Sequence, residues 1–283
     1  MLTNKVDFIA TIEVDNANPN GDPLAGNMPR TDSEGRGLIS DVAIKRKIRN
    51  RMQDQGNEIF VKSRDRADDG FNSLEKRFNS VFEPKDKISD EEMEKKSNEL
   101  WIDVRSFGQV ITYQKKSIGI RGPVSISMAK SLEPIEITSM QITRSTNGQE
   151  KEGSARASDT MGTKHFVEYG VYVVFGSANV FFSEKTGFSE EDLKVIKESL
   201  LTLFANDASS ARPEGSMAVK ELFWFTHSNK LGNVSSAKIH DLLEYDHSTM
   251  EHTNYEDYQI KLKQGKLAEY EDKGLQVEII EGL

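Results

Sequence analysis

The sequence of 283 residues contains no cysteine. This absence excludes disulfide frameworks, zinc sites with thiolate ligands and cysteine nucleophiles. No stretch approaches the roughly 20 apolar residues that a transmembrane helix needs, and the N-terminus lacks the apolar segment of a signal peptide. We therefore expect a cytoplasmic protein without membrane contact.

Sequence motifs of catalysis and metal binding are also missing. The five histidines include no pair at the spacing of zinc hydrolases, and no serine elbow, P-loop or dinucleotide fingerprint occurs. Asparagines alternate near residue 18 as in a calcium loop, but Asn16 and Asn27 stand where that loop requires Asp and a bidentate Glu. We predict no metal and no cofactor.

Positive charge is scarce overall but not evenly so. The net charge is −9, and residues 241–283 carry 11 acidic and four basic side chains, while residues 83–99 carry seven and four. Residues 1–82 and 100–240 are close to neutral. The acidity is thus confined to two segments, and the overall charge does not exclude a nucleic-acid ligand.

A predicted strand leads into a loop rich in turn residues. Residues 6–14 alternate apolar and polar side chains, which is typical of a half-buried strand. The following DNANPNGDP stretch, residues 15–23, supplies side-chain amides and open backbone N–H groups. Such groups can bind phosphate, and the loop is therefore a candidate anion site.

A strongly basic helix is expected over residues 40–51. At about 100° per residue, the helix separates an apolar stripe from its charged side chains. The stripe comprises Ile44, Ile48 and Met52; Lys45, Arg46 and Arg49 share another face, and Lys47 and Arg51 lie on the opposite flank. The first cationic face could contact phosphates, and the alternative is an ordinary solvated surface.

The rest of the chain alternates between predicted helices and strands. Apolar residues at helical spacing predict a helix over residues 71–82, and a solvated helix or loop is expected over 89–100. Ordered structure is expected to resume at residue 101, and another helix to begin after Ser189. Strands are expected at 117–128, 135–144, 166–175 and 215–225. The polar segment 145–163 predicts a long hairpin whose tip cannot bury a core of its own. This element order fits an α+β protein of the ferredoxin-like kind with insertions.

Several motifs together carry a family resemblance. They are NPNGDP at 18–23, GNMPR at 26–30, GLISDV at 37–42, KRKIRN at 45–50, DVRSFG at 103–108, GPVS at 122–125 and GTKH at 162–165. In this order they resemble the backbone subunit of type I-C CRISPR surveillance complexes (Cascade). The resemblance spans residues 4 to about 230.

The resemblance implies a hand-shaped fold, with a palm similar to an RNA-recognition motif, a finger insertion and a β-hairpin thumb. The palm would comprise residues 1–53, 101–134 and 169–240, the finger-like insertion 54–100, the thumb 135–168, and an acidic C-terminal segment 241–283. The implied partners are the CRISPR RNA, target DNA through the guide, further copies of the chain in a filament, and the large and guide-processing subunits of Cascade.

The resemblance also implies a set of RNA-binding residues. These are Asn18, Asn20 and Arg30 in the loop, Ser40, Lys45, Arg46 and Arg49 on the helix, Phe107 and Arg121 in the palm, and Met140, Thr143, Arg144, Lys164 and His165 in the thumb. A guide must present its base edges for pairing, so the protein is expected to grip phosphates and sugars. No aromatic base-stacking motif is present in the first two palm strands, which agrees with such a grip.

Three functions remain compatible with the residues. The first, which the resemblance implies, is a non-catalytic subunit that oligomerises along the guide spacer and presents it to target DNA. The second is a metal-dependent RNA endonuclease of the related type III kind, for which Asp15, Asp22 or Asp41 would have to act. The third is a stand-alone protein that binds single-stranded RNA.

Overall fold

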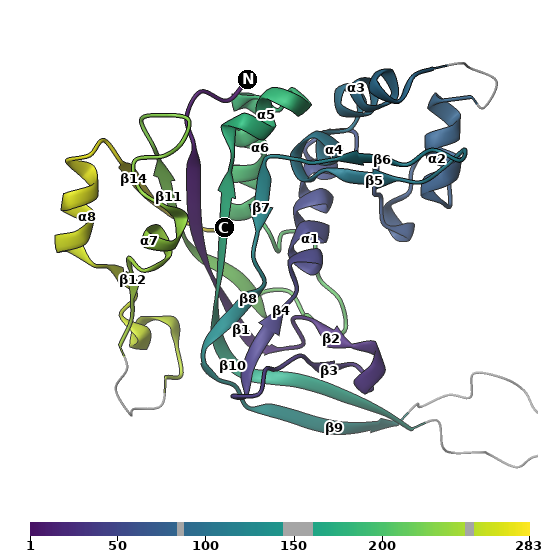
Figure 1. Cartoon of the computed structure of the whole chain (residues 1–283). Helices are drawn as coiled ribbons and strands as arrows, with labels where there is room; N and C mark the ends of the chain where they lie inside the picture. Colours follow the sequence, from purple (N-terminus) through teal and green to yellow (C-terminus); the bar gives the residue numbers. More distant parts are fainter. Residues whose placement is uncertain (84–87, 144–160, 247–251) are drawn as a thin grey trace, which may run out of the picture.

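One large antiparallel sheet organises the chain, as Figure 1 shows for the computed structural model. The structure describes residues 1–83, 88–143, 161–246 and 252–283. The sheet has eight strands in the order β14-β11-β1-β10-β8-β4, with β7 and β9 also paired to β10. The strands are β1 (Val6–Ala17), β4 (Arg36–Ile39), β7 (Val124–Ile126), β8 (Ala129–Pro134), β9 (Ile137–Thr143), β10 (Met161–Ala178), β11 (Met217–Thr226) and β14 (Gln276–Glu281). The predicted α+β class is confirmed, whereas the ferredoxin-like detail stays a prediction.

Strand β1 lies at the centre of this sheet. It pairs antiparallel with β10 on one side and β11 on the other. Residues 6–12 are all buried, on both faces of the sheet. The prediction of a half-buried strand was therefore wrong, because each face of the sheet is covered by a separate layer.

Helices cover one face of the sheet. They are α1 (Asp41–Asp54), α5 (Val180–Thr186) and α6 (Glu190–Leu201). Ser40 caps α1 by accepting a hydrogen bond from the Ala43 N–H at 3.2 Å. Ile44, Ile48 and Met52 are buried against the sheet, so the predicted apolar stripe is confirmed.

The acidic C-terminal segment covers the opposite face. We call residues 234–246 and 252–275 the C-terminal cap; it contains α7 (Ser236–His240), β12 (Leu243–Glu244), a 3-10 turn (Tyr255–Tyr258), β13 (Lys261–Leu262) and α8 (Gln264–Glu271). Ile239, Leu242 and Tyr258 of the cap pack with Ile9 and Phe223 of the sheet in a second hydrophobic core. The acidic C-terminal segment is thus a folded layer with a hydrophobic core of its own against the sheet. None of the described helices is both long and apolar enough to cross a bilayer.

The segment predicted to form the finger-like insertion has a third, separate core. Its elements are a 3-10 turn (Arg64–Arg66), α2 (Leu74–Val81), α3 (Asp90–Leu100), α4 (Ile102–Phe107), β5 (Gln109–Ile111) and β6 (Ile118–Ile120). Phe60, Phe78 and Trp101 pack with Ile111 and Ile120. This core therefore extends beyond residue 100, the end expected for the insertion.

The strand expected over residues 117–128 is divided in two. β6 pairs with β5 inside the insertion, whereas β7 pairs with β10 in the main sheet. Between them, a Cβ atom on Gly122 would lie 2.3 Å from the Ser106 carbonyl oxygen. The close backbone approach at Gly122 and the following Pro123 explain why one continuous strand was the wrong prediction.

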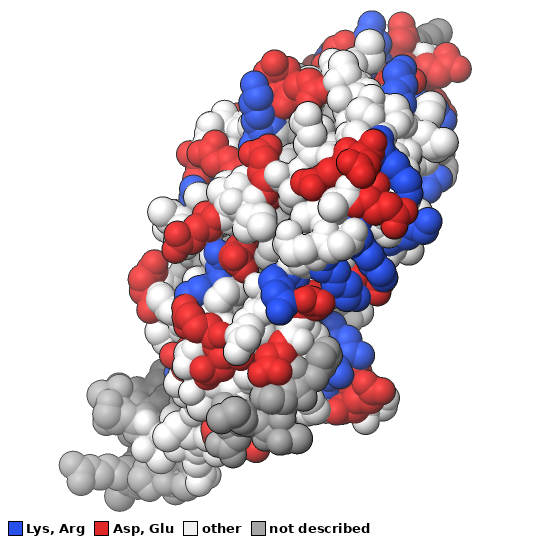
Figure 2. Space-filling model, turned by 90° about the vertical axis from the view of Figure 1, so that its left-hand side faces the viewer, with Lys and Arg blue, Asp and Glu red and all other residues white. Residues whose placement is uncertain are grey.

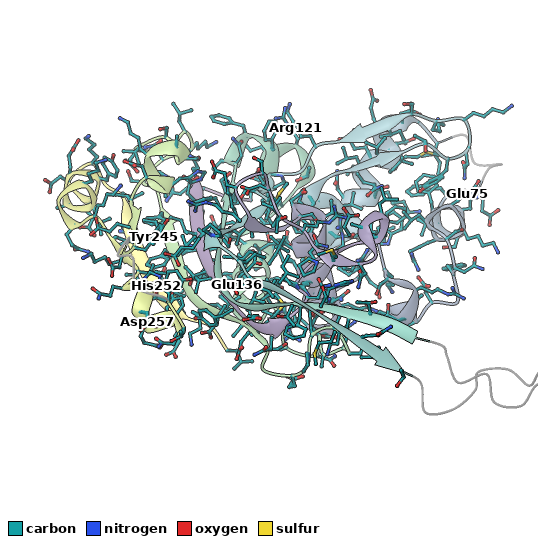
Figure 3. The ribbon with its side chains drawn as sticks, turned by 90° about the horizontal axis from the view of Figure 1, so that it is seen from below. Glu75, Arg121, Glu136, Tyr245, His252 and Asp257 are labelled. Carbon is teal, nitrogen blue, oxygen red and sulfur yellow. The ribbon has the colours of Figure 1, made fainter. Side chains whose placement is uncertain are left out.

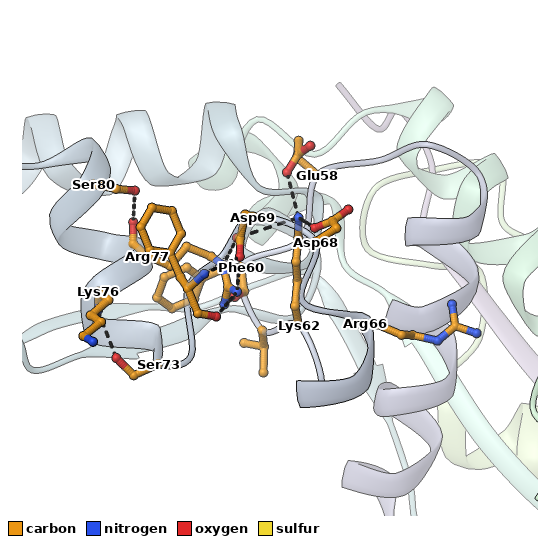
Figure 4. Close-up of polar contacts among 12 residues, drawn as sticks. Glu58, Phe60, Lys62, Arg66, Asp68, Asp69, Ser73, Lys76, Arg77 and Ser80 are labelled. Atoms are coloured by element: carbon orange, nitrogen blue, oxygen red, sulfur yellow. Dashed lines mark hydrogen bonds and ion pairs between the residues drawn. The ribbon is translucent and has the colours of Figure 1, made fainter.

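An ion-pair network joins the start of the insertion to α2 (Figure 4). Lys62 Nζ lies 2.6 Å from Asp68 Oδ1 and 3.3 Å from Glu58 Oε2. Arg77 bonds to Asp69 Oδ2 at 2.5 Å and donates to the Phe60 carbonyl at 2.8 Å. The hydrogen bond from Arg77 lowers the pKa of Asp69 to about 2. These cations hold the insertion together.

Candidate nucleic-acid interface

The Asn-rich loop, residues 18–30 after β1, is fixed by hydrogen bonds within the loop and to the segment before β11. The buried Asn18 donates its side-chain amide to the Asn27 carbonyl at 2.7 Å, and its backbone N–H bonds to the Ala211 carbonyl at 2.9 Å. The loop forms the short strands β2 (Gly21–Asp22) and β3 (Met28–Pro29). A Cβ at Gly21 would lie 2.8 Å from the Asn27 backbone carbonyl oxygen, which favours glycine at this position.

The loop is joined directly to the start of α1. Asn20 Oδ1 accepts a hydrogen bond from the Ser40 backbone N–H at 2.9 Å. Arg30 forms an ion pair with Asp22 at 3.3 Å, and its side chain is 37% exposed. The structure thus brings together the four predicted residues Asn18, Asn20, Arg30 and Ser40, although their RNA contacts stay a prediction.

The predicted cationic face of α1 is largely occupied by intramolecular partners. Lys45 pairs with Asp41 at 3.0 Å, and Arg49 Nε lies 2.9 Å from Oδ2 of the fully buried Asp103. Arg46 donates to the Val61 carbonyl at 2.6 Å. Arg46 also lines a pocket on the side of α1 that bears Lys47. Lys45, Arg46 and Arg49 therefore do not form one free cationic surface.

That pocket is a polar cavity of about 410 Å³ between the Asn-rich loop, α1, and the loop before β11. We call it the basic basin. Its ionisable lining side chains are Arg46, Lys47, Arg66, Arg212, Asp65 and Asp207, an excess of two positive charges. Asn20, Asn50 and Asn206 add amide groups to the lining. This combination of cations and amides suits an anion.

Carboxylates neutralise part of the basic basin. Asp207 bonds to Lys47 and lies 3.3 Å from Arg212 Nε. Arg66 lies 2.5 Å from Asp54 and donates to the Asn206 carbonyl at 3.1 Å. No carboxylate pairs with Arg46 in the described part of the chain, and its guanidinium donates to the Val61 carbonyl instead. Burial lowers the pKa of Lys47, and the carboxylate of Asp207 only partly opposes this effect.

Sequence reasoning did not identify Arg66 or Arg212. Arg66 lies in the finger insertion and Arg212 in the loop before β11, whereas the predicted residues came from α1 and the preceding loop. Arg212 also donates to the Asn18 carbonyl at 3.4 Å, which ties its loop to the predicted site. No local pattern marks either arginine, because the three segments meet only in the folded chain.

The two predicted palm residues lie at different places. Phe107, at the end of α4, is half-buried with the Arg49 guanidinium 5.1 Å from its ring. Arg121 is exposed and precedes β7, whose Val124 pairs with Ala178 at the C-terminal end of β10. Lys164 lies near the other end of β10. At about 3.3 Å per residue, some 45 Å of strand separates the two ends, so Arg121 lies far from the thumb residues, and its RNA contact stays a prediction.

The thumb prediction corresponds to a two-stranded extension of β9 and β10. In its register Met140 faces Lys164, and Ser139 faces His165. Side chains alternate between faces, so Met140 and Lys164 share one face while Thr143 and His165 lie on the other. Met140 is 52% exposed. The fifth predicted thumb residue, Arg144, lies outside the described residues, as do residues 145–160 of the predicted polar segment 145–163.

The sheet face opposite the helices is closed to base stacking by the C-terminal cap. The Tyr255 hydroxyl donates to Glu221 Oε2 at 2.6 Å and also lies 2.8 Å from Thr11 Oγ1. Tyr169 donates to Glu13 at 2.8 Å. Burial and these acidic partners raise the pKa of both tyrosines. Figure 2 shows the side that bears the cap, where acidic and basic side chains are intermingled.

The carboxylates considered for metal-dependent cleavage have other roles. Asp22 accepts from the Leu24 N–H at 3.0 Å and pairs with Arg30, and Asp41 pairs with Lys45. Asp15 is exposed and accepts from the Asn16 side chain at 2.7 Å. Among the described residues no cluster of three or more acidic, histidine or cysteine side chains is arranged to hold a metal ion.

Comparisons with known proteins agree on one family. The family model described as CRISPR-associated protein Cas7 matches residues 4–263. A Haloferax volcanii protein named CRISPR-associated protein Cas7 is 24% identical over 209 residues, which are 68% of this chain but 61% of that protein's length. A chain in a structure titled CRISPR RNA-guided surveillance complex matches with a TM-score of 0.53 and 14% identity, covering 97% of this chain and 88% of that one. The structural match concerns the fold.

Proposed function

The chain belongs to the Cas7 family of CRISPR-associated proteins, and we propose that it binds the backbone of a CRISPR RNA within a surveillance complex. The observation that carries this proposal is the basic basin, which gathers Arg46, Arg66 and Arg212 beside the Asn-rich loop. Phosphodiester groups match its cations and amides, and such contacts hold a strand without reading its sequence.

The covered sheet supports a grip on the backbone. Proteins with an RNA-recognition motif usually stack bases on aromatic residues of an open sheet face. Here Tyr255 and Tyr258 of the C-terminal cap pack over that face. A guide held instead at the basin and the Asn-rich loop would keep its base edges free, as pairing with target DNA requires.

Oligomerisation along the guide spacer is part of the proposal. The extension of β9 and β10 projects away from the palm (Figure 1) and carries exposed Met140 and Ile142. An apolar hairpin face of this kind suits a contact with RNA held by the adjacent copy. The motifs at 18–50, 103–125 and 162–165 support the type I-C assignment and, with it, the large and guide-processing subunits as partners.

We propose that the subunit is non-catalytic. The structural roles of Asp22 and Asp41 as turn and helix-start residues account for both carboxylates without cleavage chemistry. The type III kind of endonuclease is the alternative, and no contact among the described residues favours it.

The salt dependence of RNA binding tests the basin. Arg46→Gln combined with Arg212→Gln removes two cations from the lining. With about 0.7 in slope per phosphate contact for single strands, the plot of log affinity against log salt should flatten by about 1.4. Fluorescence anisotropy with a labelled single-stranded RNA measures this slope.

The matched control removes two cations from the cap. Lys266 and Lys273 of the C-terminal cap are about half exposed and pair with surface carboxylates. Their replacement by Gln should leave affinity and slope unchanged. Equal slopes for the wild type and a folded basin variant would contradict RNA binding at the basin, and thermal melting verifies that the variant is folded.

A further inference from the structure

Aromatic and cationic side chains form a cluster on α5 and beside it, far from the basic basin. The Arg121 guanidinium lies 4.2 Å from the centroid of the Phe182 ring, and Lys185 Nζ lies 5.9 Å from the same centroid. The neighbouring Phe181 is 47% exposed. We call Arg121, Phe181, Phe182 and Lys185 the α5 platform.

The charges of this platform are not compensated. Neither Arg121 nor Lys185 forms an ion pair within the described ranges of the chain. The nearest acidic side chain in sequence, Glu184, is already bonded to Lys230. By contrast, Lys45, Lys47 and Arg49 on α1 each have a carboxylate partner. The platform therefore offers two exposed cations beside an exposed aromatic ring.

We propose that the α5 platform binds single-stranded nucleic acid as a second contact site, beyond the guide contacts proposed for the basin. Aromatic rings and arginine guanidinium planes are both stacking surfaces for unpaired bases. Positive side chains beside them neutralise the phosphates that connect those bases. An unpaired strand presents both groups together, so its chemistry matches the whole platform.

The position of the platform separates it from the guide site. Arg121 and α5 lie at the C-terminal end of β10, whereas the Asn-rich loop contacts the region near its other end through β1. Ala17 at the end of β1 pairs with Val167, and Val6 pairs with Ala178. Figure 3 shows Arg121 near the upper margin of the view and Glu136, which precedes β9, nearer its middle. A ligand on the platform thus need not displace one at the basin.

Photo-cross-linking of the full chain tests this proposal. The probe is a short, fluorescein-labelled oligothymidylate in which bromodeoxyuridine replaces some thymidines. Mass spectrometry should place cross-links on residues 181–185. Phe181→Ala should weaken binding of the probe about fivefold or more through the lost stacking, and should remove the cross-link.

Charge variants separate stacking from attraction. Arg121→Gln with Lys185→Gln should lower the salt slope by about 1.4, whereas Arg121→Lys should keep the slope but weaken binding. Lys266→Gln with Lys273→Gln serves as the control. All replaced side chains of the platform are exposed, and thermal melting confirms that each variant is folded.

Two results would overturn the proposal. One is the absence of cross-links at residues 181–185 together with unchanged probe affinity in the folded platform variants. The other is a platform change that abolishes contact with another protein subunit and leaves nucleic-acid binding intact. The Arg46→Gln and Arg212→Gln variant should retain the cross-link, so failure of the basin proposal is distinguishable from failure of this one.

Discussion

Replacing Asp103 by Asn should destabilise the protein strongly. The Asp103 side chain is fully buried and pairs with Arg49 at 2.9 Å. It also accepts hydrogen bonds from the backbone N–H groups of Phe60 at 2.8 Å and Val61 at 3.1 Å. The amide removes the charge that Arg49 needs and replaces one acceptor oxygen by a donor. Arg49 is only 11% exposed, so its charge would be left buried without a partner.

The expected loss follows from the cost of breaking a buried pair. Removing one partner of such a pair costs about 3–5 kcal/mol. For a chain of this size, about 2 °C of melting temperature per kcal/mol predicts a decrease of at least about 6 °C. Thermal melting followed by circular dichroism measures this change.

Asp68→Asn is the matched control in the same insertion. Asp68 is 63% exposed, and its buried partner Lys62 also pairs with Glu58, so the loss of Asp68 should cost less than about 1 kcal/mol. A melting temperature for Asp103→Asn within 2 °C of that control would refute the reasoning, and would return Arg49 to the set of available phosphate contacts.

Three further predictions concern the cap, the insertion and catalysis. Tyr255→Phe removes the donor to Glu221 and should lower the free energy of unfolding by about 1.5–3 kcal/mol, measured by urea titration, with RNA affinity unchanged. Arg77 holds the pKa of Asp69 at about 2, so Asp69 contributes stability above its unfolded pKa of about 3.9, and this contribution is lost as pH falls towards 2. The difference in urea midpoint between wild type and Asp69→Asn should therefore shrink as pH falls from about 4 to 2. A constant difference would contradict the assignment. Purified protein incubated with single-stranded RNA and magnesium should not cleave it, and cleavage that disappears in Asp22→Ala would favour the endonuclease alternative.

Local patterns predicted the elements that depend on local contacts. The strand, loop and helix over residues 6–54 follow from side-chain alternation, from turn residues and from the Ser40 cap. The helix expected after Ser189 is α6, whose Leu193, Ile196 and Leu200 recur at helical spacing and are buried. These signals lie within one turn or one strand, so they need no knowledge of the fold.

The C-terminal cap was not predicted. Its buried residues Leu242, Tyr258 and Leu267 are widely spaced among acidic side chains and follow no single period. They become a core only against the outer face of the sheet, which the sequence does not display. The same reason explains why β1 was expected to be half-buried, since the layer that covers its second face comes from the far end of the chain.

The candidate site was predictable only in part. Asn20 and Ser40 were identified from neighbouring motifs and do lie together, 2.9 Å apart between side-chain oxygen and backbone nitrogen. Arg66 and Arg212 were missed because they reach the basin from separate segments. The pairing of Arg49 with Asp103 was equally hidden, since a basic residue on a helix gives no sign of a buried partner 54 positions later.

The length of RNA that co-purifies with the chain tests the central claim most directly. The protein would be expressed together with a CRISPR array, purified at moderate salt, treated with nuclease and analysed for bound RNA. We predict a guide-derived RNA of defined length that elutes with several copies of the chain, and less of it for Arg46→Gln with Arg212→Gln. Elution as a monomer with no RNA, or with RNA fragments of random length and origin, would contradict the proposed role along the guide.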